Sequence, residues 1–241
     1  MKKFILSLCL VFTAVLLFSS CAWAAMSGPE VSPLRGQVRS NEDFVNFCCY
    51  SSPEDVERAI KDGANANARS ENGTTALYAA VSESDSPEVV KILLENGAGV
   101  NAMNEEGRTP LHIACYRNSI PVITMLLDAG ADINARANGD DDGFTPLISA
   151  TEHPRVKTMA FLLDRGADIS ARDSYGVTAF WYAAIYDFGD EFANISVLQL
   201  LLGRGAEINA RDKEGKTVLT AASEFQPPEV IAFLRDHGAA E

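Results

Sequence analysis

Apolar residues recur along the chain at helical spacing, in segments that follow one another at regular intervals. In each segment the apolar side chains stand at positions i, i+3 and i+4, which places them on one face of a helix. Examples are Val90-Leu93-Leu94, Ile123-Leu126-Leu127 and Met159-Leu162-Leu163. A Gly-Ala pair follows each segment, and glycine in this place ends a helix in a left-handed cap. The pattern predicts a series of short amphipathic helices, with Leu126 and Leu127 facing the core.

A second apolar segment precedes each of these helices and predicts a partner helix. It begins with Gly-x-Thr, at Gly73, Gly107, Gly143, Gly176 and Gly215. Threonine caps a helix, and a following proline fits the first turn, where its missing N–H costs nothing. Pairs of small residues within the segment let neighbouring first helices pack closely. Each unit therefore reads as helix–turn–helix, followed by an Asn-Ala pair that leads into a hairpin-like finger.

The units form an array with a period of about 33 residues and two longer intervals. We expect repeats at residues 42–69, 70–103, 104–136, 137–172, 173–211 and 212–241. The terminal repeats differ from the others, as the ends of a solenoid require. Ala59 replaces a leucine in the first repeat, and Arg235 replaces a leucine in the last, which predicts an outer face there.

The segment Gly-Arg-Thr-Pro-Leu-His-Ile-Ala-Cys at residues 107–115 resembles the ankyrin signature, and weaker copies begin at the other Gly-x-Thr positions. The resemblance covers residues 42–241. It implies an all-α solenoid of about six helix-turn-helix units with short β-hairpin fingers. It also implies a protein-binding module that uses the fingers and the concave face of the first helices.

Alignment of the repeats predicts which side chains face a partner. The outward set is rich in aromatic residues, which often dominate interface energetics, and in finger acids that form a rim. The helix positions are Tyr116, Arg117, His153, Tyr186 and Phe225. The finger positions are Glu105, Glu106, Arg108, Asp141, Asp142, Phe144 and Tyr175. The predicted partner is a protein with an apolar centre and a basic edge. An ordinary amphipathic surface without a partner is the alternative.

The three histidines do not predict a catalytic centre. His112 stands in the ankyrin signature, where the resemblance implies a hydrogen-bonding role between neighbouring repeats. His153 and His237 lie one and three repeats away from it, so the three cannot converge. No nucleophile–histidine–acid arrangement, zinc-ligand spacing or phosphate loop appears, and no cofactor or metal is expected. An enzyme with catalytic groups grafted onto the fingers is the third functional hypothesis.

The N-terminus predicts export. Lys2 and Lys3 precede an apolar run at residues 4–18, and Ala22-Trp23-Ala24 offers a cleavage site, so residues 1–24 read as a signal peptide. Residues 25–41 read as a flexible tether. In the alternative, Cys21 is lipidated as in bacterial lipoproteins, although Phe18 departs from that pattern. Membrane attachment is expected only through this anchor.

Charge narrows the choice of partner. The net charge is −13 and no basic stripe appears, so nucleic acid is not expected to bind. The leading functional hypothesis is a protein-interaction module of the cell envelope, in the periplasm or secreted. The runner-up is a secreted effector or toxin-neutralising protein.

Three cysteines remain after the signal peptide. Cys48 and Cys115 occupy the same repeat position and read as small core residues. Two repeats separate them, about 20 Å, which excludes a disulfide between them. Cys49 is expected to point away from that face and to be a candidate reactive thiol.

Two expansions interrupt the period. Residues 138–143 lengthen one finger and imitate the first half of a calcium loop, but the twelfth position is Ser149, so a solvated acidic finger is favoured. Residues 187–194 lengthen the loop between two helices. Phe188 and Phe192 there either pack back or meet a partner.

Overall fold

The structure is a computed structural model that describes residues 38, 40–84, 86–117, 119–139, 143–152, 155–186 and 191–241. The chain divides into two compact parts, Met1–Ala98 and Gly99–Glu241. The predicted signal peptide, Cys21 and most of the tether lie outside the described residues. Within the described ranges, no helix is both long and apolar enough to cross a membrane.

The N-terminal part holds two antiparallel helix pairs, the first two predicted repeats. The first helices α3 and α5 pack against each other, and so do the second helices α4 and α6. The bounds are Asn41–Tyr50 for α3, Pro53–Lys61 for α4, Ala76–Glu83 for α5 and Pro87–Glu95 for α6.

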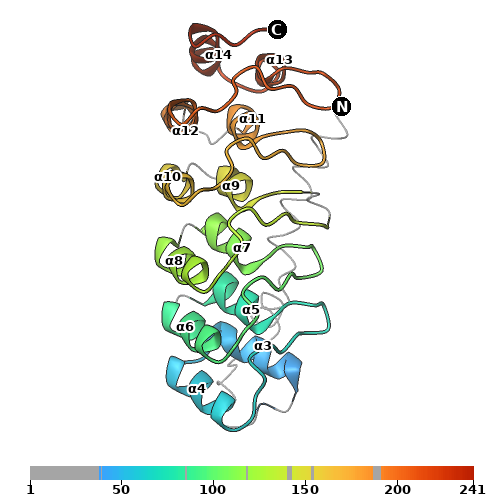
Figure 1. Cartoon of the computed structure of the whole chain (residues 1–241), viewed down its shortest axis with the longest axis vertical. Helices are drawn as coiled ribbons and strands as arrows, with labels where there is room; N and C mark the ends of the chain where they lie inside the picture. The colour runs from blue at the N-terminus through green and yellow to red at the C-terminus, as the bar shows by residue number, and fades with distance from the viewer. Residues whose placement is uncertain are drawn as a thin grey trace. The chain divides into compact units, whose positions relative to one another are not determined.

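The C-terminal part holds the four remaining repeats. In Figure 1 its first helices form one row, its second helices form another, and the fingers project on the far side of the first row. The bounds are Pro110–Arg117 (α7), Ile120–Asp128 (α8), Pro146–Ser149 (α9), Ala150–Glu152 (η1), Val156–Asp164 (α10), Ala179–Ile185 (α11), Glu191–Gly203 (α12), Val218–Ala222 (α13) and Pro228–Asp236 (α14). This arrangement confirms the all-α repeat prediction.

Threonine starts the first helices, as the sequence predicts. The hydroxyl of Thr75 accepts a hydrogen bond from the N–H of Tyr78, and Thr145, Thr178 and Thr217 cap their helices in the same way. Capping satisfies one backbone donor that a helix start leaves without a partner. The second helices end at glycines in the left-handed region, such as Gly130 at φ 89°.

The fingers are simpler than the predicted β-hairpins. Three of them are closed by a single antiparallel bridge, between Arg69 and Thr75, Arg172 and Thr178, and Arg211 and Thr217. No β-strand forms in the part of the chain that the structure describes. A short turn leaves room for one bridge, because the next helix begins directly after the threonine.

Repeat 4 has an irregular first helix. One α-helical turn, α9, passes into the 3₁₀ turn η1, which carries Glu152. Turns of 3₁₀ geometry are frequent at the ends of α-helices. The expansion in repeat 5 was expected as a loop through Asn194. The structure instead starts α12 at Glu191, because the added residues extend the helix by a turn. Phe188 and the side chain of Phe192 lie outside the described residues.

The core follows the predicted helical faces with one correction. Leu111, Ile123, Leu126 and Leu162 are fully buried between neighbouring helices. Leu127 was expected to be as buried as Leu126 but is half-buried, because it faces the flank of α8 rather than its inner side. The terminal Arg235 is exposed, as its charge predicts.

Candidate functional site

Aspartate and asparagine side chains shape the fingers of the C-terminal part. Asp173 Oδ1 accepts from the N–H groups of Tyr175 and Val177, at 2.9 and 2.8 Å. Asp212 repeats this arrangement in the last finger. Asn104 accepts from the N–H of Arg108 at 2.9 Å. These bonds hold each tight turn and fix the direction of the residues that follow it.

Neighbouring fingers dock on one another. A β-carbon at Gly107 would overlap Asn138, and one at Gly139 would overlap the backbone of Glu106. The N–H of Lys213 donates to the carbonyl of Tyr175 at 2.9 Å in the last two fingers. Glycine permits these approaches because it has no side chain. Neighbouring finger turns of the C-terminal part are therefore in direct contact.

The predicted helix-end residues are accessible to different degrees. Arg117 is exposed, Phe225 is 41% exposed, and Tyr116 is half-buried. Tyr186 is half-buried, with its ring stacked on Tyr182 at a centroid distance of 5.7 Å. His153 lies outside the described residues. We call Tyr116, Arg117, Tyr186 and Phe225 the helix-end surface. Each lies in the last turn of a first helix of the C-terminal part or within three residues after it.

Two of the four predicted finger acids are exposed, and the outward prediction for Phe144 is wrong. Glu105 and Glu106 are exposed, and Tyr175 is half-buried. Phe144 is only 2% exposed, and its ring meets Tyr182 edge-on with a centroid distance of 5.0 Å. The expanded finger returns through Gly143, which turns Phe144 inward instead of outward. Asp141 and Asp142 lie outside the described residues.

Arg108 was predicted to face outward and is instead 3% exposed. Its Nη2 lies 3.7 Å from Oε1 of Glu152 in the next repeat, and both side chains are 4% exposed. Burial first, and Glu152 second, raises the pKa of Tyr116, whereas Arg108, Arg155 and Arg117 lower it. Charges of two neighbouring repeats therefore act on this tyrosine. The alignment placed Glu152 in the slot of Tyr116, but it could not show that Arg108 reaches across to it.

A polar and aromatic cluster lies beneath Tyr186. The hydroxyl of Tyr182 donates to Oδ2 of Asp173 at 2.6 Å, and burial, together with the charge of Asp173, raises the pKa of Tyr182. Burial also raises the pKa of Asp173. Trp181 packs edge-on to Tyr182 at 6.4 Å. The cluster fixes the finger of repeat 5 to helix α11.

The structure confirms the predictions for Cys48 and Cys115 and contradicts the one for Cys49. Cys48 and Cys115 are fully buried, as expected of core residues, and burial raises the pKa of the Cys115 thiol. Cys49 is only 3% exposed, so the prediction of an outward thiol is wrong. Its Sγ lies 3.6 Å from the carbonyl oxygen of Val45, one helical turn back.

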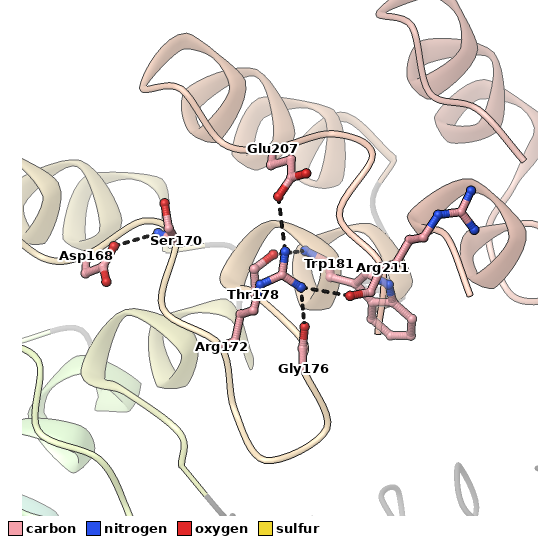
Figure 2. A network of polar contacts seen from close by, with 8 residues as sticks. All are labelled: Asp168, Ser170, Arg172, Gly176, Thr178, Trp181, Glu207 and Arg211. Carbon is pink, nitrogen blue, oxygen red and sulfur yellow. Dashed lines mark hydrogen bonds and ion pairs between the residues drawn. The ribbon is translucent and has the colours of Figure 1, made fainter. Parts of the chain in front are cut away.

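Asparagine side chains connect neighbouring repeats. Asn101 donates to the carbonyl of Gly130 at 3.0 Å and accepts from the N–H of Asp132 at 2.9 Å. Asn67 and Asn209 also donate to the next glycine carbonyl. Repeat 4 has Ser170 in this position. There Arg172 supplies the connection to the next repeat, as Figure 2 shows.

His112 also connects two repeats, as the sequence predicts. It is fully buried, its Nδ1 accepts from the N–H of Thr109 at 3.1 Å, and its Nε2 lies 3.0 Å from the carbonyl oxygen of Phe144. These contacts are structural and leave no ring nitrogen for proton transfer. No group of three or more His, Cys, Asp or Glu side chains suited to a metal ion occurs among the described residues.

Comparisons with known proteins agree with this geometry. The family pattern described as ankyrin repeats (3 copies) matches residues 45–137 and 136–212. The crystal structure of the ankyrin repeat domain of Bcl-3, a member of the IkappaB protein family, is similar with a TM-score of 0.66 and 26% sequence identity. That similarity covers 80% of this chain and 81% of the other. No curated protein sequence matches. Ankyrin-repeat domains typically bind proteins and are not catalytic, and this chain belongs to the ankyrin-repeat family.

Proposed function

We propose that this chain is an exported binding module that recognises a protein partner through the helix-end surface of its C-terminal part. The observation that carries the proposal is Phe225, a large aromatic residue that is 41% exposed in the turn after α13. Tyr116 and Tyr186 stand at the ends of two other first helices. Partly buried aromatic rings contribute large contact area at little entropic cost, so they serve well as anchors.

The departures from the repeat pattern support this position of the binding surface. Repeat 4 carries the expanded finger and the 3₁₀ turn, and the buried Arg108–Glu152 pair joins it to repeat 3. Repeat 5 carries the expansion that precedes α12. Repeat-specific insertions commonly lie on the binding face of a solenoid. Both irregular repeats belong to the part of the chain that carries the helix-end surface.

The charges define the expected partner. Exposed Glu105 and Glu106 lie on the finger side, and Glu224, which precedes Phe225, is exposed and paired with Lys216. This arrangement suits a partner that is apolar at its centre and basic at its edge. Arg117, next to Tyr116, would meet an acidic or polar group of the partner. Electrostatic complementarity of this kind acts mainly on the association rate and on specificity.

A pull-down tests the proposal. The chain without residues 1–24 serves as bait in crosslinked envelope fractions, and captured partners are titrated against variants. Combined alanine substitutions of Tyr116, Tyr186 and Phe225 should weaken binding by about 2 kcal/mol or more. The matched control is Phe161→Ala, because Phe161 is a half-buried aromatic on the second helix α10. Equal affinity of the triple variant and the unaltered chain would disprove the proposed surface.

The proposed export of the protein has its own test. Intact mass of the natural protein should show loss of residues 1–24, which supports a free exported form. A lipid on Cys21 would establish an anchored form instead. Recovery of the protein from culture medium rather than from periplasm or membrane would favour the effector role over the envelope role.

A further inference from the structure

The chain contains three Asn-Gly pairs, Asn72-Gly73, Asn96-Gly97 and Asn138-Gly139. In such a pair the glycine amide nitrogen can attack the asparagine side chain, because glycine has no side chain to obstruct it. The attack needs a backbone nitrogen that is not held by a hydrogen bond and a side chain that can rotate toward it. The three pairs differ in whether the structure meets these two requirements.

The first two pairs are held. The N–H of Gly73 donates to the carbonyl of Ser70 at 3.0 Å, and the side-chain oxygen of Asn72 accepts from the N–H of Thr74 at 3.3 Å. The N–H of Gly97 donates to Leu94, and the carboxamide of Asn96 donates to Ile92 at 2.8 Å. In both pairs, attack requires that hydrogen bonds of the nitrogen and of the side chain break together.

The third pair is not held in this way. The side chain of Asn138 is exposed, and in the described part of the chain neither it nor the N–H of Gly139 makes a hydrogen bond. Instead, the pair lies at the contact between two neighbouring fingers. Asn138 and Gly139 lie against Gly107 and the backbone of Glu106 in the preceding finger.

We propose that Asn138 is a site of spontaneous deamidation that changes the charge and the docking of this finger. The Gly139 nitrogen bonds to Cγ of Asn138 and loses its proton, while the bond from Cγ to the side-chain nitrogen breaks and ammonia leaves. Water then opens the cyclic imide and yields aspartate or isoaspartate. The overall change exchanges an amide NH₂ for a hydroxyl, and water is the only other reactant.

The product has two consequences for the neighbouring finger. A new carboxylate appears against Gly107, one residue from the exposed Glu106, where like charges repel. Isoaspartate also lengthens the backbone by one carbon, at a position where the two fingers approach too closely to admit a β-carbon. The docked pair of fingers should therefore separate after conversion. Aged protein then differs from fresh protein on the acidic edge of the surface, independently of whether that surface binds the proposed partner.

Peptide mass spectrometry tests the proposal directly. Trypsin places the three pairs in separate peptides, at residues 70–91, 92–108 and 137–155. After incubation of the folded chain in mildly alkaline buffer, peptide 137–155 should acquire the deamidation mass at least about tenfold faster than the other two, because each of those must first break hydrogen bonds. The mass gain also distinguishes Asn138 from isomerisation at Asp142-Gly143, which leaves the mass unchanged.

Two controls make the outcome decisive. In urea the three peptides should convert at similar rates, which would show that folding and not local sequence separates them. The variant Asn138→Gln should remove the acidic form that accumulates on ion exchange. The proposal is wrong if peptide 137–155 of the folded chain converts no faster than the other two, or if Asn138→Gln accumulates the acidic form at the same rate.

Discussion

Arg172 donates from Nη1 to the backbone carbonyl oxygen of Arg211 at 2.8 Å, and so joins two neighbouring fingers. The same nitrogen donates to Gly176 within its own finger at 2.8 Å, and Nη2 reaches Glu207 at 3.1 Å (Figure 2). Other joints use an asparagine two residues earlier. Because a serine hydroxyl is shorter than a carboxamide, Ser170 does not replace that asparagine, and the arginine fork makes the connection.

Arg172→Ala should therefore loosen the last two repeats. The variant loses two charge-assisted bonds to carbonyl oxygens and one exposed ion pair, which together contribute about 1–2 kcal/mol. Hydrogen exchange should quicken at the amides of Ala206 and Ala210, which follow α12. The amide of Ala131 in repeat 3 should be unaffected.

The double variant Ser170→Asn with Arg172→Ala is the matched rescue. It restores the residue that connects the other joints and should recover much of the lost protection. Added salt should weaken the unaltered joint slightly, because the Glu207 pair is exposed. Unchanged exchange in Arg172→Ala would show that the fork contributes nothing to the joint.

Leu126 and Leu127 should differ sharply in their effect on stability. Leu126→Ala removes a fully buried side chain in repeat 3 and should cost about 2–5 kcal/mol through lost burial and a cavity. Leu127→Ala removes a half-buried side chain and should cost clearly less. Urea unfolding measures both, with Arg235→Ala as the exposed control. Equal losses for the two leucines would contradict the orientation of α8.

The periodic features could be predicted from sequence because each lies within one repeat. Apolar spacing determines which face of a helix is buried, and Gly-x-Thr determines where the first helix begins, as at Thr145 and Thr178. Such signals depend on residues three or four positions apart. They predicted the repeat number and the helix pairs, whereas the structural role of His112 was implied by the resemblance to ankyrin repeats.

The contacts between repeats could not be predicted in the same way. Phe144 turns inward because the finger before it is longer, and alignment treats its position as equivalent to that of shorter fingers. Arg108 is buried because Glu152 of the next repeat lies within its reach. Each outcome depends on finger length or on a side chain about one repeat away.

Asp173 should make stability depend on pH. Burial raises the pKa of its carboxyl, more than the hydrogen bonds from Tyr182, Val177 and Tyr175 lower it. The folded chain therefore holds this proton more tightly than the unfolded chain does. The stabilising contribution is fully present below the ordinary pKa of aspartate and is lost as pH rises through the raised pKa.

Asp173→Asn tests this relationship. The variant keeps an oxygen that accepts from the finger N–H groups, as Asn104 does in repeat 3, and it removes the buried charge. Its unfolding free energy should vary less with pH than that of the unaltered chain between acidic and neutral conditions. Urea midpoints at several pH values measure the difference. Asp212→Asn is the control, because Asp212 has the same role in a less buried finger; parallel profiles for all three proteins would refute the assignment to Asp173.

Among the polar residues of repeat 3, His112 should be the one whose substitution lowers the free energy of unfolding most. The Thr109 N–H donates to Nδ1, so Nε2 carries the hydrogen and donates to the carbonyl of Phe144 in repeat 4. His112→Ala leaves that N–H without its partner in a buried site and removes one of the two donors to the Phe144 carbonyl, which keeps the N–H of Ala137. It should cost about 1–3 kcal/mol. His112→Gln keeps one donor and one acceptor on a side chain of similar length, so it should recover part of the loss. His112→Ile, which copies Ile148 of repeat 4, fills the space but makes neither bond, and should not recover it if hydrogen bonding dominates. Urea unfolding followed by circular dichroism ranks the three variants. Recovery by isoleucine but not by glutamine would show that His112 acts through packing rather than through its connection to Phe144.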